Sequence, residues 1–143
     1  MPIATIPSLL SAARDAGRGL LAVNVIQVEH AEAFVAAAEA ANCPVVLQIS
    51  ENAAKYHGGL APIGLATLAI ARASTADVVV HLDHAESEEL VFEALDLGFT
   101  SVMFDGSRSE DAENRDRTAA VRTDPARSRR RKAAQALLLK APA

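Results

Sequence analysis

The sequence of 143 residues has few of the residue types on which disulfide-rich, membrane-spanning or aromatic-rich folds depend. Its single cysteine, Cys43, excludes an internal disulfide and fits a reducing compartment. Aromatic residues make up 3% of the chain and tryptophan is absent. No apolar run approaches the roughly 18 residues of a membrane-spanning helix, and the amino terminus lacks a signal-peptide pattern. We therefore expect a cytoplasmic chain with one folded domain and no membrane partner.

Charge is divided unevenly along the chain. Residues 1–107 hold 4 Lys and Arg against 13 Asp and Glu, which gives a net charge of -9. Residues 108–143 hold 10 Lys and Arg against 5 Asp and Glu, which gives a net charge of +5. A basic tail for nucleic acid or a membrane surface is one interpretation, but no aromatic side chains accompany the arginines for stacking on bases. We favour the other interpretation, a reading-frame change or internal deletion, and do not expect a nucleic-acid partner.

The acidic segment alternates short apolar strands with helices. Continuous apolar runs predict strands at residues 20–25, 44–50, 77–83 and 100–105. Helical patterns and their start and stop signals predict helices at residues 7–16, 29–41, 62–73 and 87–97. Nearly continuous apolar strands with helices between them indicate a parallel sheet covered on both faces. Two architectures fit, an open doubly wound sheet and part of a (β/α)8 barrel.

Polar residues at the strand ends favour the barrel. The four predicted strands end in Asn24, Ser50, Asp83 and Asp105. A barrel gathers its active site from the carboxyl ends of successive strands, whereas an open sheet concentrates such residues at one switch point. No strand leads into a glycine-rich nucleotide-binding motif, which also argues against the open sheet. The simpler alternative is that these residues only cap strands and begin loops.

The most distinctive stretch is His81-Leu82-Asp83-His84, which ends the third predicted strand. Side chains alternate along a strand, so His81 and Asp83 share one face and Asp83 reaches its rim. His84, the first residue past the predicted strand, can turn its imidazole over the same rim. An aspartate beside a histidine suits an acid/base partner and a metal ligand. The alternative is a packed core histidine followed by the start of a loop.

These residues carry a resemblance to a known family. His81-Leu82-Asp83-His84 resembles the H-x-D-H motif of the class II, zinc-dependent fructose-bisphosphate aldolases. Ala22-Val23-Asn24, Gln48-Ile49-Ser50 and the stretch at 101–107 (SVMFDGS) are similar to the family's first, second and fourth strands, in order and at similar spacing. The branch of tagatose-bisphosphate aldolases shares the Asp-Gly-Ser pattern. The resemblance implies the N-terminal half of a (β/α)8 TIM barrel, with four strand–helix units, over residues 1–107.

The resemblance also implies a reaction and a site. The reaction is reversible cleavage of fructose 1,6-bisphosphate, or a related ketose bisphosphate, to glycerone phosphate and glyceraldehyde 3-phosphate. His84 would be a zinc ligand with Asp105 at the metal, and Asp83 would be the acid/base acting on the C4 hydroxyl of the phosphorylated sugar. Asn24 and Ser50 would contact the substrate. A zinc ion would act there as a Lewis acid.

The chain also departs from the family pattern. Catalytic zinc takes three protein ligands, and no histidine follows His84. A complete barrel takes about 250 residues, so residues 1–107 would form only part of one. The family pattern would continue into a helix beginning near Glu113 and Asn114, but we expect residues 108–143 to form an irregular basic tail, disordered or frame-shifted. We therefore expect a truncated, inactive aldolase that forms homo-oligomers, or alternatively a non-catalytic half-barrel that binds a partner or self-associates.

Overall fold

The computed structural model describes residues 4–123. The chain divides into two compact units, with the boundary in the sequence between Asp105 and Gly106. In the second unit the described residues form helix α6 (Asp111–Thr123), which includes Glu113 and Asn114, where the family resemblance implies a helix. Regular structure therefore continues into the segment that we expected to be irregular. Residues 124–143, which include most of the predicted basic tail, lie outside the described part of the chain.

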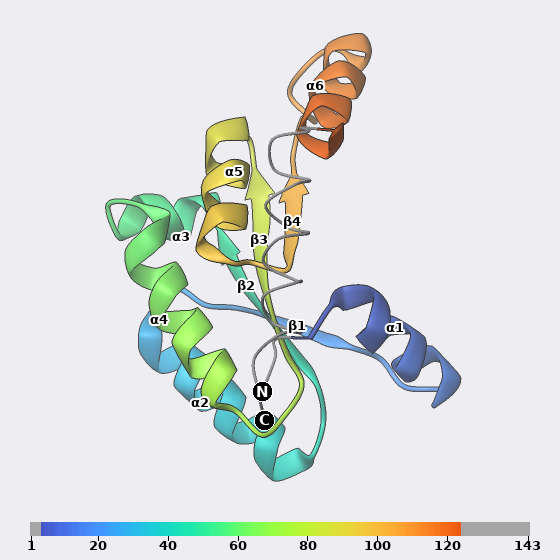
Figure 1. Ribbon diagram of the computed structural model, residues 1–143, viewed down its shortest axis with the longest axis vertical. Coiled ribbons are helices and arrows are strands. Elements are labelled where there is room, and N and C mark those ends of the chain that lie inside the picture. Colours follow the sequence, from blue (N-terminus) through green and yellow to red (C-terminus); the bar gives the residue numbers. More distant parts are fainter. Residues whose placement is uncertain (1–3, 124–143) are drawn as a thin grey trace, which may run out of the picture. The chain divides into compact units, whose positions relative to one another are not determined.

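The first unit is built around one parallel sheet (Figure 1). Its strands lie in the order β1-β2-β3-β4, which is also their order along the chain. A doubly wound sheet reverses its order at a switch point, whereas consecutive units of a (β/α)8 barrel do not. The sheet therefore confirms the predicted partial barrel. The strands are β1 (Leu21–Asn24), β2 (Val45–Ser50), β3 (Val78–Ala85) and β4 (Ser101–Phe104).

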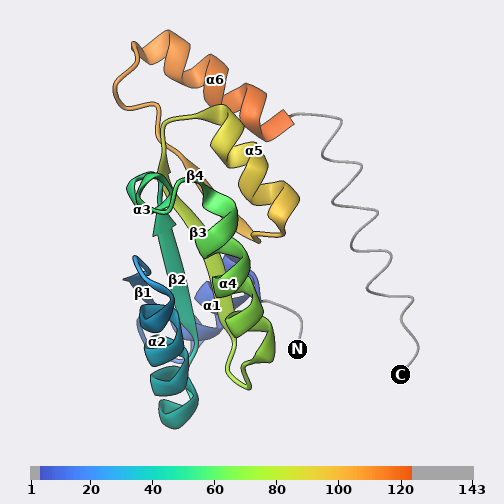
Figure 2. The same ribbon diagram turned by 90° about the vertical axis from the view of Figure 1, so that its left-hand side faces the viewer.

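The helices that connect the strands lie on one face of this sheet (Figure 2). They are α2 (Val28–Ala41), α3 (Glu51–Tyr56), α4 (Leu60–Ala73) and α5 (Glu88–Leu97). Sequential parallel strands with right-handed crossovers place successive helices on the same side. The connecting helices therefore supply the predicted cover on one face of the sheet.

The face beneath the helices is entirely apolar in the two central strands. Alternate residues of β2 and β3 point to it, and each is 4% exposed or less: Val45, Leu47, Ile49, Val78, Val80 and Leu82. Burying one such side chain stabilises the fold by roughly 1.5 to 3 kcal/mol relative to leaving it in water. This layer is the core of the first unit.

The opposite face is apolar at one end and polar at the other. At the amino end, Leu9 of α1 (Ile6–Asp15) packs on Val46 and Val79. The chain just before α1 continues this cover, because the backbone N–H of Ala4 donates to the carbonyl of Val78 at 3.1 Å. Further along the same two strands the face becomes polar and half-buried. Helix α1 therefore closes the amino end of this face and leaves its carboxyl end for the site.

Within the first unit, helix α3 is the element that the sequence did not predict. It follows β2 without a loop, and the Ser50 side chain accepts a hydrogen bond from the N–H of Ala53 at 3.1 Å, as an N-cap. Helix α4 then begins at Leu60, two residues before the predicted start, with Pro62 in its first turn. None of the helices within residues 4–123 is long and apolar enough to cross a membrane.

We predict that Leu47→Ala lowers the free energy of unfolding by about 2 to 5 kcal/mol, because Leu47 is fully buried and the shortened side chain leaves a cavity. Leu21→Ala is the matched control, since Leu21 is 65% exposed on the neighbouring strand and should change that energy by less than about 0.5 kcal/mol. Urea denaturation followed by circular dichroism measures both. Equal losses from the two variants would contradict the assignment of the core.

Candidate functional site

The candidate site lies at the carboxyl ends of the strands. Asp83 and His84 stand near the end of β3, and Asp105 directly follows β4. Ser50 ends β2 and is the register partner of Asp83. Asn24 ends β1, where it pairs with Gln48. The structure thus brings His84 into contact with both Asp83 and Asp105, with Ser50 on the adjacent strand and Asn24 one strand further along the rim.

An irregularity in β3 determines where His84 points. Leu82 pairs with Val102 and Ala85 pairs with Phe104, so three steps along β3 match two along β4. His84 lies within this bulge and has a left-handed backbone, with φ at 50°. Non-glycine residues adopt this conformation rarely, and bulges redirect side chains beside functional sites. In a regular strand Asp83 and His84 would point to opposite faces, whereas here His84 Nε2 lies 3.9 Å from Asp83 Oδ1.

Asp105 holds the His84 ring from the next strand. The distance between His84 Nδ1 and Asp105 Oδ2 is 2.8 Å. An ionised carboxylate can only accept hydrogen bonds, so Nδ1 carries the proton and donates it. This bond, with the nearby charge of Asp83, raises the pKa of His84. When His84 is neutral, its Nε2 lone pair is therefore available on a side chain that is 61% exposed.

His81 occupies a drier position on the same face. Its Nδ1 lies 2.7 Å from the Ser101 hydroxyl, and its Nε2 lies 3.8 Å from Asp83 Oδ1. Burial lowers the pKa of His81 despite the opposing effect of Asp83. The sequence left open whether His81 packs in the core. The structure places it beside Asp83, as the alternation of the strand had indicated.

The other two histidines of the sequence serve the β1–α2 loop. The His30 ring accepts from the backbone N–H groups of Ile26 and Gln27, at 3.3 and 3.4 Å. His57 Nε2 donates to the carbonyl of Ile26 at 2.6 Å. Both rings are therefore committed to backbone contacts close to Asn24, and neither belongs to the group around Asp83.

Of the side chains at this site, His84 is arranged as a metal ligand would be. Metal-ligating histidines usually donate their second ring N–H to a carboxylate, which fixes the tautomer and the ring orientation. The pair of His84 and Asp105 has this arrangement. Within residues 4–123, however, no group of three or more His, Cys, Asp or Glu side chains could hold a metal ion. His84 fits a metal as one ligand, and the described part of the chain does not complete the set.

Comparison with known proteins gives one family. The model of the family "Fructose-bisphosphate aldolase class-II" matches residues 4–127. The fructose-bisphosphate aldolase of Streptococcus pneumoniae is 39% identical over 116 residues, which cover 80% of this chain and 39% of that protein. That of Staphylococcus aureus is 36% identical over 116 residues, 80% of this chain and 41% of that protein. The chain thus spans about two fifths of the length of the curated relatives it matches.

Solved structures show the same fold. An aldolase crystal structure from Coccidioides immitis is 29% identical, with a TM-score of 0.72 over 80% of this chain and 44% of that one. The YdjI aldolase of Escherichia coli K12 has a TM-score of 0.68 at 24% identity, over 76% of this chain and 42% of that one. The similarity to the YdjI aldolase, at 24% identity, supports the fold alone. The described half-barrel therefore corresponds to part of a larger aldolase barrel.

We predict that Asp105→Asn lowers the pKa of His84 toward its ordinary value of 6.5, because the amide is a weaker acceptor and carries no charge. NMR titration of the imidazole measures this shift. A raised folded-state pKa stabilises the fold below the unfolded pKa, and that contribution is lost as the pH rises through the folded value. The difference in unfolding free energy between wild type and variant should therefore be larger at about pH 5.5 than at about pH 9. An unchanged His84 pKa in the variant would contradict this.

Proposed function

The chain belongs to the class II fructose-bisphosphate aldolase family, and from that premise we propose that it carries the half of the active site that holds the acid/base and one metal ligand. The whole reaction would be reversible cleavage of fructose 1,6-bisphosphate, or a related ketose bisphosphate, to glycerone phosphate and glyceraldehyde 3-phosphate. Zinc dependence, a place in carbohydrate breakdown and a cytoplasmic location are parts of this proposal. The observation that carries it is the contact group of Asp83, His84 and Asp105 at the strand ends of a segment that matches the family model.

In this proposal Asp83 moves the proton. During cleavage the bond between C3 and C4 of the ketose breaks, and its electron pair stays with the fragment that bears the ketone. The C4 hydroxyl becomes an aldehyde and gives its proton to the Asp83 carboxylate. In condensation Asp83 returns that proton. The half-buried position of Asp83, 15% exposed between His81 and His84, suits a base that must reach a bound substrate but not bulk water.

The remaining groups hold and orient. His84 would contribute its Nε2 to a zinc ion, with Asp105 keeping the opposite nitrogen protonated. When bound, that ion would supply Lewis-acid stabilisation of the negative charge that develops beside the ketone. The Ser50 oxygen accepts from Ala53, so its own hydroxyl proton is available to donate to a sugar or phosphate oxygen. Asn24 would contact the substrate from the exposed end of β1.

We predict that the purified chain does not cleave fructose 1,6-bisphosphate above background, because a catalytic zinc ion needs three protein ligands and residues 4–123 do not bring three such side chains together. Addition of the part of the Streptococcus pneumoniae aldolase that this chain does not cover should restore chelator-sensitive cleavage, measured as triose phosphate released. Asp83→Asn should then lower the rate by about 10²-fold or more. Glu39→Gln, at the other end of the sheet, is the matched control.

The matched segment of the pneumococcal aldolase itself is the positive control for this reconstitution. If that segment restores cleavage with its own remaining part and this chain does not, the catalytic proposal is wrong. Cleavage that persists after chelation, or that is equally fast with Asp83→Asn, would also contradict it.

A second candidate function is self-association of a non-catalytic half-barrel. The observation that favours it is the state of the sheet edges, since β1 and β4 each pair with one strand in the described sheet. Leu21 on β1 is 65% exposed and Met103 on β4 is 39% exposed. Unpaired strand edges with exposed apolar side chains invite pairing with another chain. A second copy would offer the same two edges.

We predict that the purified chain self-associates with increasing concentration in sedimentation velocity experiments. Leu21→Lys should weaken that association, because a charge on an edge strand opposes pairing. Leu65→Lys is the matched control, since Leu65 is similarly exposed at 50% but lies on helix α4. A strictly monomeric chain at all concentrations would contradict this candidate.

A further inference from the structure

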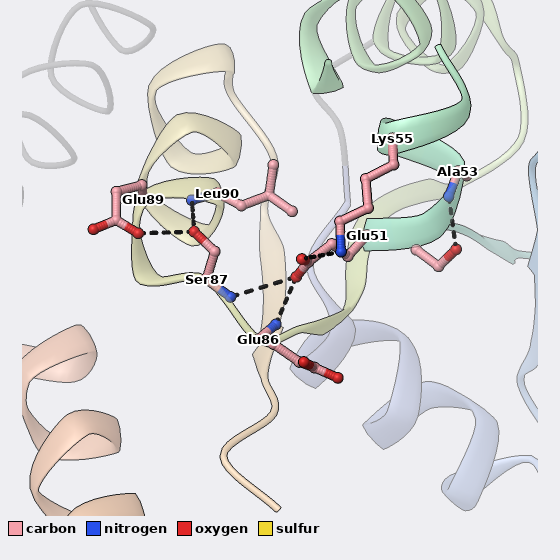
Figure 3. A network of polar contacts seen from close by, with 8 residues as sticks. Glu51, Ala53, Lys55, Glu86, Ser87, Glu89 and Leu90 are labelled. Carbon is pink, nitrogen blue, oxygen red and sulfur yellow. Dashed lines mark hydrogen bonds and ion pairs between the residues drawn. The ribbon is translucent and has the colours of Figure 1, made fainter. Parts of the chain in front are cut away.

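Glu51 links helix α3, which follows β2, to the loop that follows β3. It is the first residue of α3, directly after Ser50, and its side chain is 13% exposed. The backbone N–H of Glu86 donates to Glu51 Oε2 at 2.7 Å, and that of Ser87 donates to the same oxygen at 3.4 Å (Figure 3). The other oxygen, Oε1, lies 2.8 Å from Lys55 Nζ. One carboxylate therefore accepts from two backbone N–H groups in the loop after β3 and from the Lys55 side chain on its own helix.

The carboxylate is held in its charged form. Burial by itself favours the neutral acid, but the contacts with Lys55 and with the N–H groups of Glu86 and Ser87 outweigh it and lower the pKa of Glu51. Hydrogen bonds to an ionised acceptor are about twice as strong as those between neutral groups. The contact with the loop after β3 is consequently a strong one.

The residues that Glu51 holds, Glu86 and Ser87, come two and three positions after His84. Ala85 lies between His84 and Glu86, and its carbonyl accepts from the N–H of Asp105 at 2.7 Å. The chain leaving His84 is thus fixed from both sides, by β4 through Asp105 and by α3 through Glu51. Ser87 then caps α5 through the N–H of Leu90 at 3.2 Å, which continues the ordered path (Figure 3).

The strained backbone of His84 makes the contacts that hold the following residues important for the site. A left-handed conformation is strained for a non-glycine residue and persists only where its surroundings over-determine it. Rotation of His84 back to an extended backbone would carry its imidazole away from Asp105 and Asp83. Whatever holds residues 86 and 87 in place therefore also opposes that rotation.

We propose that Glu51 is a positioning residue for His84: by binding the backbone of Glu86 and Ser87 it keeps His84 in the left-handed conformation that brings Nδ1 to Asp105. The inference rests on the proposed function only in giving His84 a part in the reaction. The geometry on which it depends needs neither metal nor substrate. Glu51 would act on the site through the backbone alone.

The test compares Glu51→Ala and Glu51→Gln with Glu39→Ala. Glu39 is the matched control, because its Oε1 accepts from the N–H of Thr75 at 2.8 Å and from the Ser74 hydroxyl at 2.9 Å, far from His84 at the loop before β3. The measurement is the nitrogen-15 chemical shift of each His84 ring nitrogen, at a pH where the ring is neutral. These shifts report whether the proton sits on Nδ1 or Nε2.

We expect wild type and Glu39→Ala to show one tautomer with the proton on Nδ1. Glu51→Ala should lose that selectivity and give a mixture, and Glu51→Gln should lie between the two. If both Glu51 variants keep the wild-type shifts while their unfolding free energy falls as it does in Glu39→Ala, Glu51 is only structural and the proposal is wrong. If Glu51→Ala does not fold, wild-type shifts in the near-isosteric Glu51→Gln are sufficient to overturn it.

This outcome is separable from that of the catalytic proposal. Absence of aldolase activity in the reconstituted enzyme would contradict the proposed function and leave the shifts unaffected. Unchanged shifts in the Glu51 variants would contradict the positioning role and leave the proposed function intact.

Discussion

The candidate site depends on the extra residue that β3 carries opposite β4. Regular alternation would send Asp83 and His84 to opposite faces of the sheet, and the site would then hold a carboxylate without its histidine. The bulge places both on the rim and offers the His84 ring to Asp105 on the next strand. His84 adopts a rare backbone conformation, and this allows its ring to contact both Asp83 and Asp105, which two regular strands would not permit.

That strain is tolerable because the rest of the sheet is rigid. The helix-covered face of β2 and β3 is dry and close-packed, so neither strand can shift its register without exposing an apolar row. On the opposite face, Leu9 of α1 occupies the amino end against Val46 and Val79. Polar residues are consequently confined to the carboxyl end. The same two strands thus supply both the core and the floor of the site, through alternate residues.

The sequence predicted those features that depend on local pattern. Strand positions followed from apolar runs, and the placement of His81 beside Asp83 followed from the two-residue period of a strand. The sequence did not reveal α3, because Ser50 and Glu51 read as the end of a strand and its loop. The bulge could not be read either, because the φ angle of His84 is set by how β4 pairs with β3. The bonds from Glu51 to Glu86 and Ser87 join residues 35 and 36 apart and have no local signature.

Charge sets a further constraint on what this half of a barrel can do. Residues 1–107 carry a net charge of -9, and the described rim presents Asp83 and Asp105 to any ligand. The one lysine in that stretch, Lys55, is engaged by Glu51. A sugar bisphosphate is itself strongly anionic, so it would meet repulsion here unless positive charge is brought to the rim. A divalent cation beside His84 would supply part of it, and would also favour the ionised form of Asp83 that accepts a proton. The acidity of this half therefore favours binding of a cation beside His84 before an anionic substrate approaches the rim.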